Sequence, residues 1–433
     1  MSTEITETNL ETNSTWKTKL KAMGPGILMA SAAVGGSHIV SSAQAGAIYG
    51  WQLLLVVILV NLFKYPFFRF GVQYTLNTEK SLVEGYSNRG KAYLWIFFIL
   101  NVFSAMVNTA AVGILTGAIM MNIIPKSWGI SVGQITIILI ILIWAMIILG
   151  GYSVLDGISK FVMITLTLAT TIAVIIAAIK GGRHIPANFV APSPWNLAAL
   201  PFIISLMGWM PAPIEISAIN SMWLEEKKRT SEVSYEDGLF DFNVGYIGTA
   251  ILAVIFLALG ALIQYGSPEK VKPASAAYIA QLIKMYMSEI GSWSRLLIAF
   301  IAFMCLFGTT ITVIDGYSRA NDEALRILLG KEKSSQKALN IWFTVTSIIG
   351  ILIVLLFSGN VAKMMRFAMI ASFVSAPIFA WLNLSLTKHA KHSVKGGLLW
   401  LSLIGLFYLT AFAGLFIASE SGFFNWLFDK LIG

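Results

Sequence analysis

The chain has 433 residues, of which 57% are apolar and only 12% are charged. A soluble domain of this size would carry roughly 25% charged residues, so the composition indicates a membrane protein rather than two or three soluble domains. The net charge of +9 comes from Lys and Arg scattered among short links. These residues form no stripe that could follow a nucleic-acid backbone, and a single cysteine excludes a disulfide framework.

Apolar runs of about the length that crosses a bilayer follow a polar segment at residues 1–20, which we expect to be a disordered cytoplasmic tail. We interpret residues 21–433 as a single transmembrane domain. The pattern predicts an all-α membrane protein with about eleven transmembrane helices. The predicted spans are 25–47, 51–76, 93–123, 130–150, 157–179, 197–222, 240–264, 292–316, 339–358, 363–386 and 397–418.

Two of these spans contain helix breakers halfway across the membrane. The first span has two adjacent glycines followed by Ser-His, and the sixth has two prolines two residues apart. Glycine weakens a helix, and proline removes a backbone donor and clashes with the preceding turn. Irregular backbone at this depth is tolerated where it faces protein or a wet cavity. We therefore expect one central binding site, formed by Gly35, Gly36, Ser37, His38, Met207, Met210, Ala212 and Glu215.

The breaks lie five spans apart, and a unit with an odd number of helices must be inverted when it is repeated. Interrupted helices at matching positions of two halves are typical of inverted-repeat transporters. The sequence thus predicts inverted repeats over about 25–179 and 197–386, with 397–418 as an extra helix. The alternative is a pair of unrelated kinks that only pack.

Ionisable residues inside spans are costly and point to function. His38 and Glu215 follow the two breaks and could bind a cation, relay a proton or hydrogen-bond a polar solute. Packing of His38 and capping of freed backbone donors by Glu215 are the structural alternatives. Lys64 lies inside the second span, where it either reaches toward the membrane surface or pairs within the bundle.

Asp315 closes the predicted eighth span after a threonine-rich stretch. An ion pair with Arg319, four residues later, at the end of the helix is one reading. In the other reading Thr309, Thr310 and Asp315 belong to a route for a coupling ion, because hydroxyl and carbonyl oxygens suit hard cations.

The Lys and Arg residues indicate the orientation in the membrane. The N-terminal tail and every second loop carry roughly twice as many of them as the opposite links, which places the N-terminus in the cytoplasm. An odd number of spans then places the C-terminus outside. We expect a multi-pass protein of the cell membrane.

The sequence has no Walker loop, no His-Glu-x-x-His motif and no Ser-His-Asp arrangement in a hydrophilic segment. We therefore expect no enzyme and no cofactor, and an ion gradient rather than ATP as the energy source. The expected partners are a small transported substrate and membrane lipid, without nucleic acid, and the chain is compatible with a monomer.

The sequence resembles the NRAMP family of divalent-metal transporters, which belongs to the superfamily with the LeuT fold. The resemblance is carried by Gly24-Pro25-Gly26, by Gln44-Ala45-Gly46-Ala47 with Tyr49-Gly50, and by Met210-Pro211. It implies a secondary transporter that works by alternating access, with two broken helices around the substrate.

The chain departs from the family's motifs at the metal site. Aligned through 44–47, residues 35–38 stand in place of the family's Asp-Pro-Gly-Asn, so the carboxylate ligand is missing. The thioether ligand remains as Met210, whereas Ala212 replaces a histidine tied to proton movement. The acidic positions of the family's third span align with Ala110 and Gly113.

Losing a carboxylate leaves the charge of a dehydrated divalent ion uncompensated. Two substrate classes follow. Either His38, Met210 and Glu215 form a rewired cation site, or the fold carries a small organic or polar solute. A membrane sensor that does not transport is a lesser alternative. The sequence leaves the substrate, the coupling ion and the direction of transport open.

Overall fold

The computed structural model describes Trp16, Lys19 and residues 23–150, 153–357, 359–387 and 394–422. All regular elements in these ranges are helices. Of the predicted tail at 1–20, Trp16 packs edge-on against Phe240, with ring centroids 5.7 Å apart, and Lys19 lies over both rings. The rest of that tail, and the C-terminal residues whose location was predicted, lie outside the described residues.

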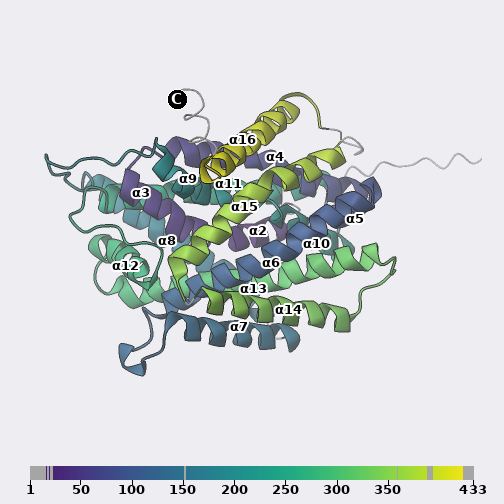
Figure 1. Ribbon diagram of the computed structural model, residues 1–433, viewed down its shortest axis with the longest axis horizontal. Coiled ribbons are helices and arrows are strands. Elements are labelled where there is room, and N and C mark those ends of the chain that lie inside the picture. The colour runs from purple at the N-terminus through teal and green to yellow at the C-terminus, as the bar shows by residue number, and fades with distance from the viewer. Residues whose placement is uncertain are drawn as a thin grey trace, which may run out of the picture.

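The helices follow the predicted spans in chain order, and the first and sixth spans are each split (Figure 1). Their bounds are α2 Pro25–Ala33, η1 Ser37–Ser42, α3 Ala43–Tyr49, α4 Leu54–Thr78, α5 Leu82–Arg89, α6 Lys91–Met120, η2 Lys126–Trp128, α7 Val132–Ile148, α8 Ser153–Ile179, η3 Leu197–Ala199, α9 Leu200–Gly208, α10 Ile216–Thr230, α11 Tyr235–Ile263, α12 Ala276–Ile290, α13 Ser294–Leu328, α14 Gln336–Leu356, α15 Val361–Leu386 and α16 Gly396–Glu420.

Within the described residues, seven helices are long and apolar enough to cross a membrane, and the bent pair of α2 with η1 and α3 makes an eighth. Three shorter apolar helices are Val132–Ile148, Ile164–Ile179 and Leu197–Gly208. Each predicted span therefore coincides with a helix or a broken pair of helices. The total of eleven crossings stays a prediction, because it is reached only when the three shorter helices also cross.

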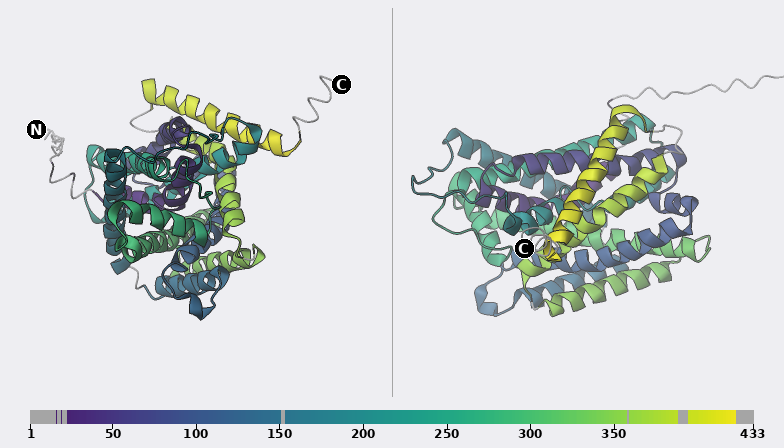
Figure 2. Two further views of the ribbon diagram at one scale, coloured as in Figure 1. Left: turned by 90° about the vertical axis from the view of Figure 1, so that its left-hand side faces the viewer. Right: turned by 45° about the horizontal axis from the view of Figure 1, so that its top comes forward.

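The broken helices occupy the middle of the bundle. α2 and α10 lie at its centre, α7 and α14 run along one edge, and α16 crosses the opposite edge (Figures 1 and 2). α16 packs on α4, α9 and α15 and exposes much of its length, as expected for a helix outside the core of a membrane bundle. The chain thus places its two irregular segments where neighbouring helices surround them.

Small residues bring the first broken helix against α11. A Cβ atom on Gly46 would lie 1.9 Å from the backbone oxygen of Leu257, and one on Gly260 would lie 2.1 Å from that of Ala43. Only glycine permits this approach of the two backbones, and such contacts are common between membrane helices. At the other end, the Asp241 carboxylate accepts hydrogen bonds from the Gly24 and Gly26 N–H groups at 3.1 and 2.6 Å.

The helix of the eighth predicted span extends beyond that span. The span was predicted to end at 316, with Asp315 at the end of the helix, but α13 continues to Leu328. The segment after Asp315 carries polar residues on a helix that leaves the apolar region, and a hydropathy pattern does not detect such an extension. Asp315 therefore lies inside α13 rather than at its end.

Candidate functional site

The two helix breaks leave free backbone groups at the centre of the bundle. The helix pair Pro25–Ala33 and Ser37–Tyr49 bends by 48° at residues 34–36. α9 ends at Gly208, and α10 begins at Ile216 after a segment that contains both prolines. Terminal turns of helices have unpaired N–H and C=O groups, so both breaks place backbone dipoles in the interior.

A cavity of about 40 Å³ lies between the breaks, with room for a few water-sized atoms. Both breaks and two further helices contribute to it. Its lining consists of Ala32, Ala33, Gly35, Gly36, Ser37, Asn108, Val112, Trp209, Ala212, Pro213, Ile216, Ile219, Trp223, Thr309, Thr312, Val313 and Tyr317. The described lining is aromatic, aliphatic, hydroxyl and amide in character, and it contains neither a carboxylate nor an imidazole.

The structure therefore brings only part of the predicted site to the cavity. Gly35, Gly36, Ser37 and Ala212 line it. The other predicted residues, His38, Met207, Met210 and Glu215, are buried but do not contribute to this lining. Gly36 fits tightly, since a Cβ atom there would come within 2.8 Å of the Trp209 ring and 3.0 Å of Met365 Cε.

His38 points toward α11. Its Nε2 lies 3.0 Å from the backbone oxygen of Thr249, and its Nδ1 lies 2.8 Å from the Ser37 hydroxyl. The carbonyl can only accept, so Nε2 carries a proton. The Ser37 hydroxyl also donates to the backbone oxygen of Ala33 at 3.2 Å. Both ring nitrogens are occupied, and the ring is fully buried beside Phe256. In this arrangement His38 attaches the first break to α11.

Lys64 of α4 reaches the second break. Its Nζ donates hydrogen bonds to the backbone oxygens of Met207, Gly208 and Ala212 at 2.7, 2.8 and 3.3 Å, and the side chain is fully buried. The oxygens of Met207 and Gly208 lie at the end of α9, where the helix dipole is negative, and that of Ala212 lies in the break after it. Lys64 thus caps α9 with a positive charge and also interacts electrostatically with Glu215.

Glu215 belongs to a chain of polar groups that ends at the cavity. The Tyr317 hydroxyl donates to Glu215 Oε1 at 3.2 Å, and Asn108 Nδ2 donates to the Tyr317 oxygen at 2.9 Å. The Ser104 side chain also interacts with the carboxylate. Tyr317 and Asn108 both line the cavity, whereas Glu215 does not. Glu215 is therefore connected to the cavity through the hydrogen bonds of these two residues.

The candidates for a coupling ion are separated along α13. Thr309 lines the cavity and donates to the backbone oxygen of Cys305 at 3.0 Å. Thr310 donates to the oxygen of Leu306 and shares a hydrogen bond of 2.9 Å with Thr116. Asp315 forms an ion pair with Arg319 at 2.8 Å. No group of three or more His, Cys, Asp or Glu residues within the described ranges could hold a metal ion.

A larger hollow of about 590 Å³ adjoins the cavity and opens between α2, α10 and α13. We call it the vestibule. It shares Ile219, Trp223 and Thr312 with the cavity, and these residues form the neck between the two. On the opposite side a separate hollow of about 240 Å³ is lined by Gln44, Lys272 and Met365, among others. That outer hollow shares no lining residue with the cavity. Trp209 of the cavity lining and Met365 of the outer hollow both lie close to Gly36.

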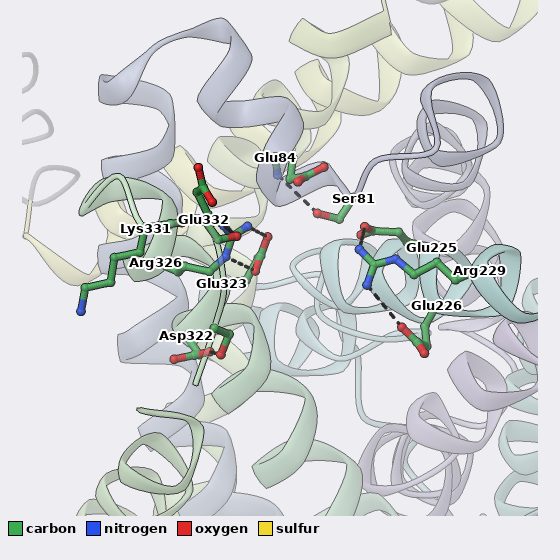
Figure 3. A network of polar contacts seen from close by, with 11 residues as sticks. Ser81, Glu84, Glu225, Glu226, Arg229, Asp322, Glu323, Arg326, Lys331 and Glu332 are labelled. Carbon is green, nitrogen blue, oxygen red and sulfur yellow. Dashed lines mark hydrogen bonds and ion pairs between the residues drawn. The ribbon is translucent and has the colours of Figure 1, made fainter. Parts of the chain in front are cut away.

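Charged residues of α10 and α13, among them Glu225, Arg229 and Glu323, line the vestibule, and Figure 3 shows the network of polar contacts to which they belong. Arg229 pairs with Glu225 at 2.6 Å and with Glu226 at 3.6 Å on α10. Arg326 pairs with Glu323 at 2.6 Å on α13. Glu84 of α5 interacts electrostatically with Glu225. Most of these pairs join residues of one helix, so they stabilise individual helices more than they bridge the vestibule.

The family comparison decides the identity. The family model described as Nramp, natural resistance-associated macrophage protein-like, matches residues 26–419. The chain belongs to this family. A protein of Pasteurella multocida described as uncharacterized is 60% identical over 425 residues, covering 98% of this chain and 97% of that protein. With its apolar helices, this Nramp-family chain is a multi-pass membrane protein.

Solved structures support the same fold. A mutant of the manganese transporter of Eremococcus coleocola matches with a TM-score of 0.68 and 14% identity, covering 96% of this chain and 90% of that one. The same transporter in complex with an aromatic bis-isothiourea compound matches with a TM-score of 0.66 and 15% identity, over the same shares of the two chains. The predicted resemblance and the predicted all-helical transporter fold are confirmed.

Asn108 and Tyr317 were not predicted as site residues. Asn108 is one of three asparagines within the apolar span 93–123, with Asn101 and Asn122, and polarity at that depth is a signal that was available. Tyr317 lies directly after the predicted end of its span, in the part of α13 that continues beyond it. Lys64 was noted as a charge inside a span, but its carbonyl partners lie 143 or more residues away and could not be read from the sequence.

Proposed function

We propose that the chain is a secondary transporter that carries a small polar solute through the cavity between its two broken helices by alternating access. The Nramp family and the broken helices support the transport mechanism. The substrate is assigned from the lining of the cavity. Its hydroxyl, amide and aromatic groups suit a neutral or zwitterionic solute better than a bare divalent cation.

This proposal rests on the hydrogen-bond partners of the ionisable groups around the breaks. A dehydrated divalent cation is normally bound by carboxylate or imidazole ligands that offset its charge. Here the His38 ring is engaged with Thr249 and Ser37, and Glu215 faces Tyr317. Neither group lines the cavity.

Lys64 adds a second obstacle to a cation. Its ammonium group uses three carbonyl oxygens at the second break, which are the backbone ligands that a broken helix could otherwise offer. A divalent ion at these oxygens would have to displace or face a buried positive charge, and such repulsion is strong at low dielectric. The break is therefore occupied by a cation of the protein itself.

We propose further that the N-terminus is cytoplasmic and that the vestibule opens to the cytoplasm. Lys227, Lys228 and Arg229 at the end of α10 lie on the side with the excess of positive charge. The cavity adjoins the vestibule, while it shares no lining residue with the outer hollow. The described conformation is then the inward-open one.

A panel of solutes tests the substrate class. Purified protein in detergent is heated with Mn²⁺, Mg²⁺, Na⁺, amino acids or small organic acids, and the unfolding temperature is recorded. Ligands that bind the folded state raise it by mass action. We expect amino acids or organic acids to give the largest concentration-dependent shifts. Shifts with Mn²⁺ alone would contradict the proposal.

Transport of a divalent metal is the second candidate, and the similarity to a manganese transporter favours it. In that case Met210 would be the expected soft ligand, although its side chain does not line the cavity in this conformation. Binding of Mn²⁺ that is lost in Met210→Ala would favour this alternative.

A further inference from the structure

The hydrogen-bond chain from Glu215 to Asn108 has a direction that its neighbours fix. Lys64 Nζ has three carbonyl acceptors, which matches the three donors of an ammonium group, since a neutral amine offers only two. The Lys64 ammonium group also interacts electrostatically with Glu215. The Tyr317 hydroxyl donates its proton to Glu215 Oε1, 3.2 Å away.

This direction decides how the Asn108 amide is oriented. The Tyr317 proton is used by Glu215, and the Tyr317 oxygen is therefore an acceptor for the Asn108 NH₂ group. The amide oxygen, Oδ1, then lies on the other side. Asn108 is 3% exposed and lines the cavity, and its Oδ1 has no hydrogen-bond partner among the described residues. Asn61, Asn101 and Asn220 also have unpartnered amide oxygens, but of these four residues only Asn108 lines the cavity. Because buried amide oxygens generally have a partner, Asn108 Oδ1 is the one for which a solute in the cavity can supply it.

We propose that Asn108 Oδ1 is a specificity-determining acceptor for the substrate, and that the transported solute must present an N–H or O–H donor to it. Tyr317 is a positioning residue, because its oxygen accepts from Asn108 Nδ2 and so leaves Oδ1 as the unpaired end of the amide. Trp209 and Tyr317 supply aromatic surface beside this acceptor, which suits a small solute with an apolar part. This inference rests on the proposed function, since it names the chemical feature that the polar substrate carries.

Matched pairs of solutes test the acceptor in the unaltered protein. The pairs are acetamide with N,N-dimethylacetamide, L-alanine with its N,N,N-trimethyl derivative, and lactate with 2-methoxypropionate. In at least one pair the member with the N–H or O–H group should raise the unfolding temperature, and the methylated member should bind about tenfold more weakly or worse. Equal shifts within every pair, or no shift with any donor-bearing member, would overturn the proposal.

Variants separate recognition from structural damage. In Asn108→Leu, the donor-bearing solute should lose at least tenfold in affinity. Asn101→Leu is the control, because Asn101 lies two turns earlier on α6, pairs with Asn321 and lies outside the cavity lining. It should keep wild-type affinity. In Tyr317→Phe the amide is free to rotate, so the preference within the pair should shrink while binding persists.

The outcomes distinguish this inference from the proposed function. Binding of an organic solute that is unchanged in Asn108→Leu would overturn the role of Asn108 and leave the transporter proposal standing. Saturable uptake of Mn²⁺ without binding of any organic solute would overturn both. Loss of affinity in Asn108→Leu and Asn101→Leu alike would show that α6 as a whole, and not the amide oxygen, is responsible.

Discussion

At Lys64 one ammonium group makes the hydrogen bonds that the end of α9 cannot make within the helix. Its three carbonyl partners are spread over the break, at Met207, Gly208 and Ala212. A buried charge is costly unless its hydrogen bonds are complete, and here each donor has an acceptor. The residue therefore determines how the second break is closed, although it lies outside the cavity.

Replacing Lys64 by Met should destabilise the protein strongly. The change leaves three carbonyls and the Glu215 carboxylate without the ammonium group, and breaking a buried pair costs about 3–5 kcal/mol. Thermal unfolding in detergent measures the effect. Lys80→Met, at an exposed lysine just after α4, is the matched control and should change the unfolding temperature little. The double variant Lys64→Met/Glu215→Gln should recover part of the loss, and a further drop would contradict the coupling of the two charges.

Individual residues of the site were only partly predictable. The glycines at 35 and 36 and the polar residue Ser37 were identified from local helix-breaking chemistry, which a single segment contains. The direction of the His38 side chain could not be predicted, because a hydrogen bond to the Thr249 carbonyl on α11 fixes it. Asn108 became a candidate only when Tyr317 and Glu215, far away in the sequence, gave its amide an orientation.

At the scale of elements, close contacts between backbones keep the broken first helix in place. Gly46 of α3 and Gly260 of α11 each lie against a backbone oxygen of the other helix. Association of helices in lipid depends on close packing rather than on the hydrophobic effect. A substitution that moves α3 away from α11 therefore loses packing contacts that no hydrophobic gain replaces.

The substitution Gly260→Ala should lower stability markedly, because its Cβ would lie 2.1 Å from the Ala43 oxygen and push α3 away from α11. Overpacking of this kind costs about 1–3 kcal/mol. Gly248→Ala makes the same change on the same helix where no atom lies within 4 Å, and it should be neutral or slightly stabilising. Unfolding temperatures of the two variants give the comparison. Equal values would contradict the importance of this contact.

The variant Gly36→Leu should abolish transport while the protein still folds. The side chain would meet the ends of Met365 and Leu115, which can move, and the Trp209 ring, which would have to shift, and it would fill the cavity between the breaks. Uptake by reconstituted protein and size-exclusion profiles in detergent measure the two properties. Undiminished uptake in a well-folded variant would show that the substrate passes elsewhere.

The order and approximate extent of the helices were predictable, because a run of about 20 apolar residues identifies a span from that segment alone. The breaks were predictable for the same local reason. The extension of α13 to Leu328 could not be predicted, because its polar residues do not form the apolar run by which a span is recognised. The arrangement of 25–179 and 197–386 as inverted repeats stays a prediction.

At the scale of the whole molecule, the cavity adjoins the vestibule but not the outer hollow. Ile219, Trp223 and Thr312 line both the cavity and the vestibule. The cavity shares no lining residue with the outer hollow. Alternating access requires that this asymmetry be reversed, so the contacts between α2, α10 and α13 must change in the opposite state.

Cysteine labelling tests the proposed orientation. In a Cys305→Ser background, a membrane-impermeant maleimide should label Thr312→Cys only from the cytoplasmic side, because Thr312 lies in the neck of the vestibule. Lys272→Cys is the matched marker for the outer hollow and should react only from outside. Labelling of both positions with the reverse sidedness would invert the topology derived from the positive charges.

The central claim is that the cavity between the two breaks serves a small polar solute and not a bare divalent cation. Uptake of Mn²⁺ into proteoliposomes that contain the purified protein tests it most directly, with protein-free liposomes as the baseline. We predict no saturable uptake, because His38, Glu215 and Lys64 leave the cavity without ligands of the required charge. Robust, saturable Mn²⁺ uptake that is lost in Met210→Ala would contradict it.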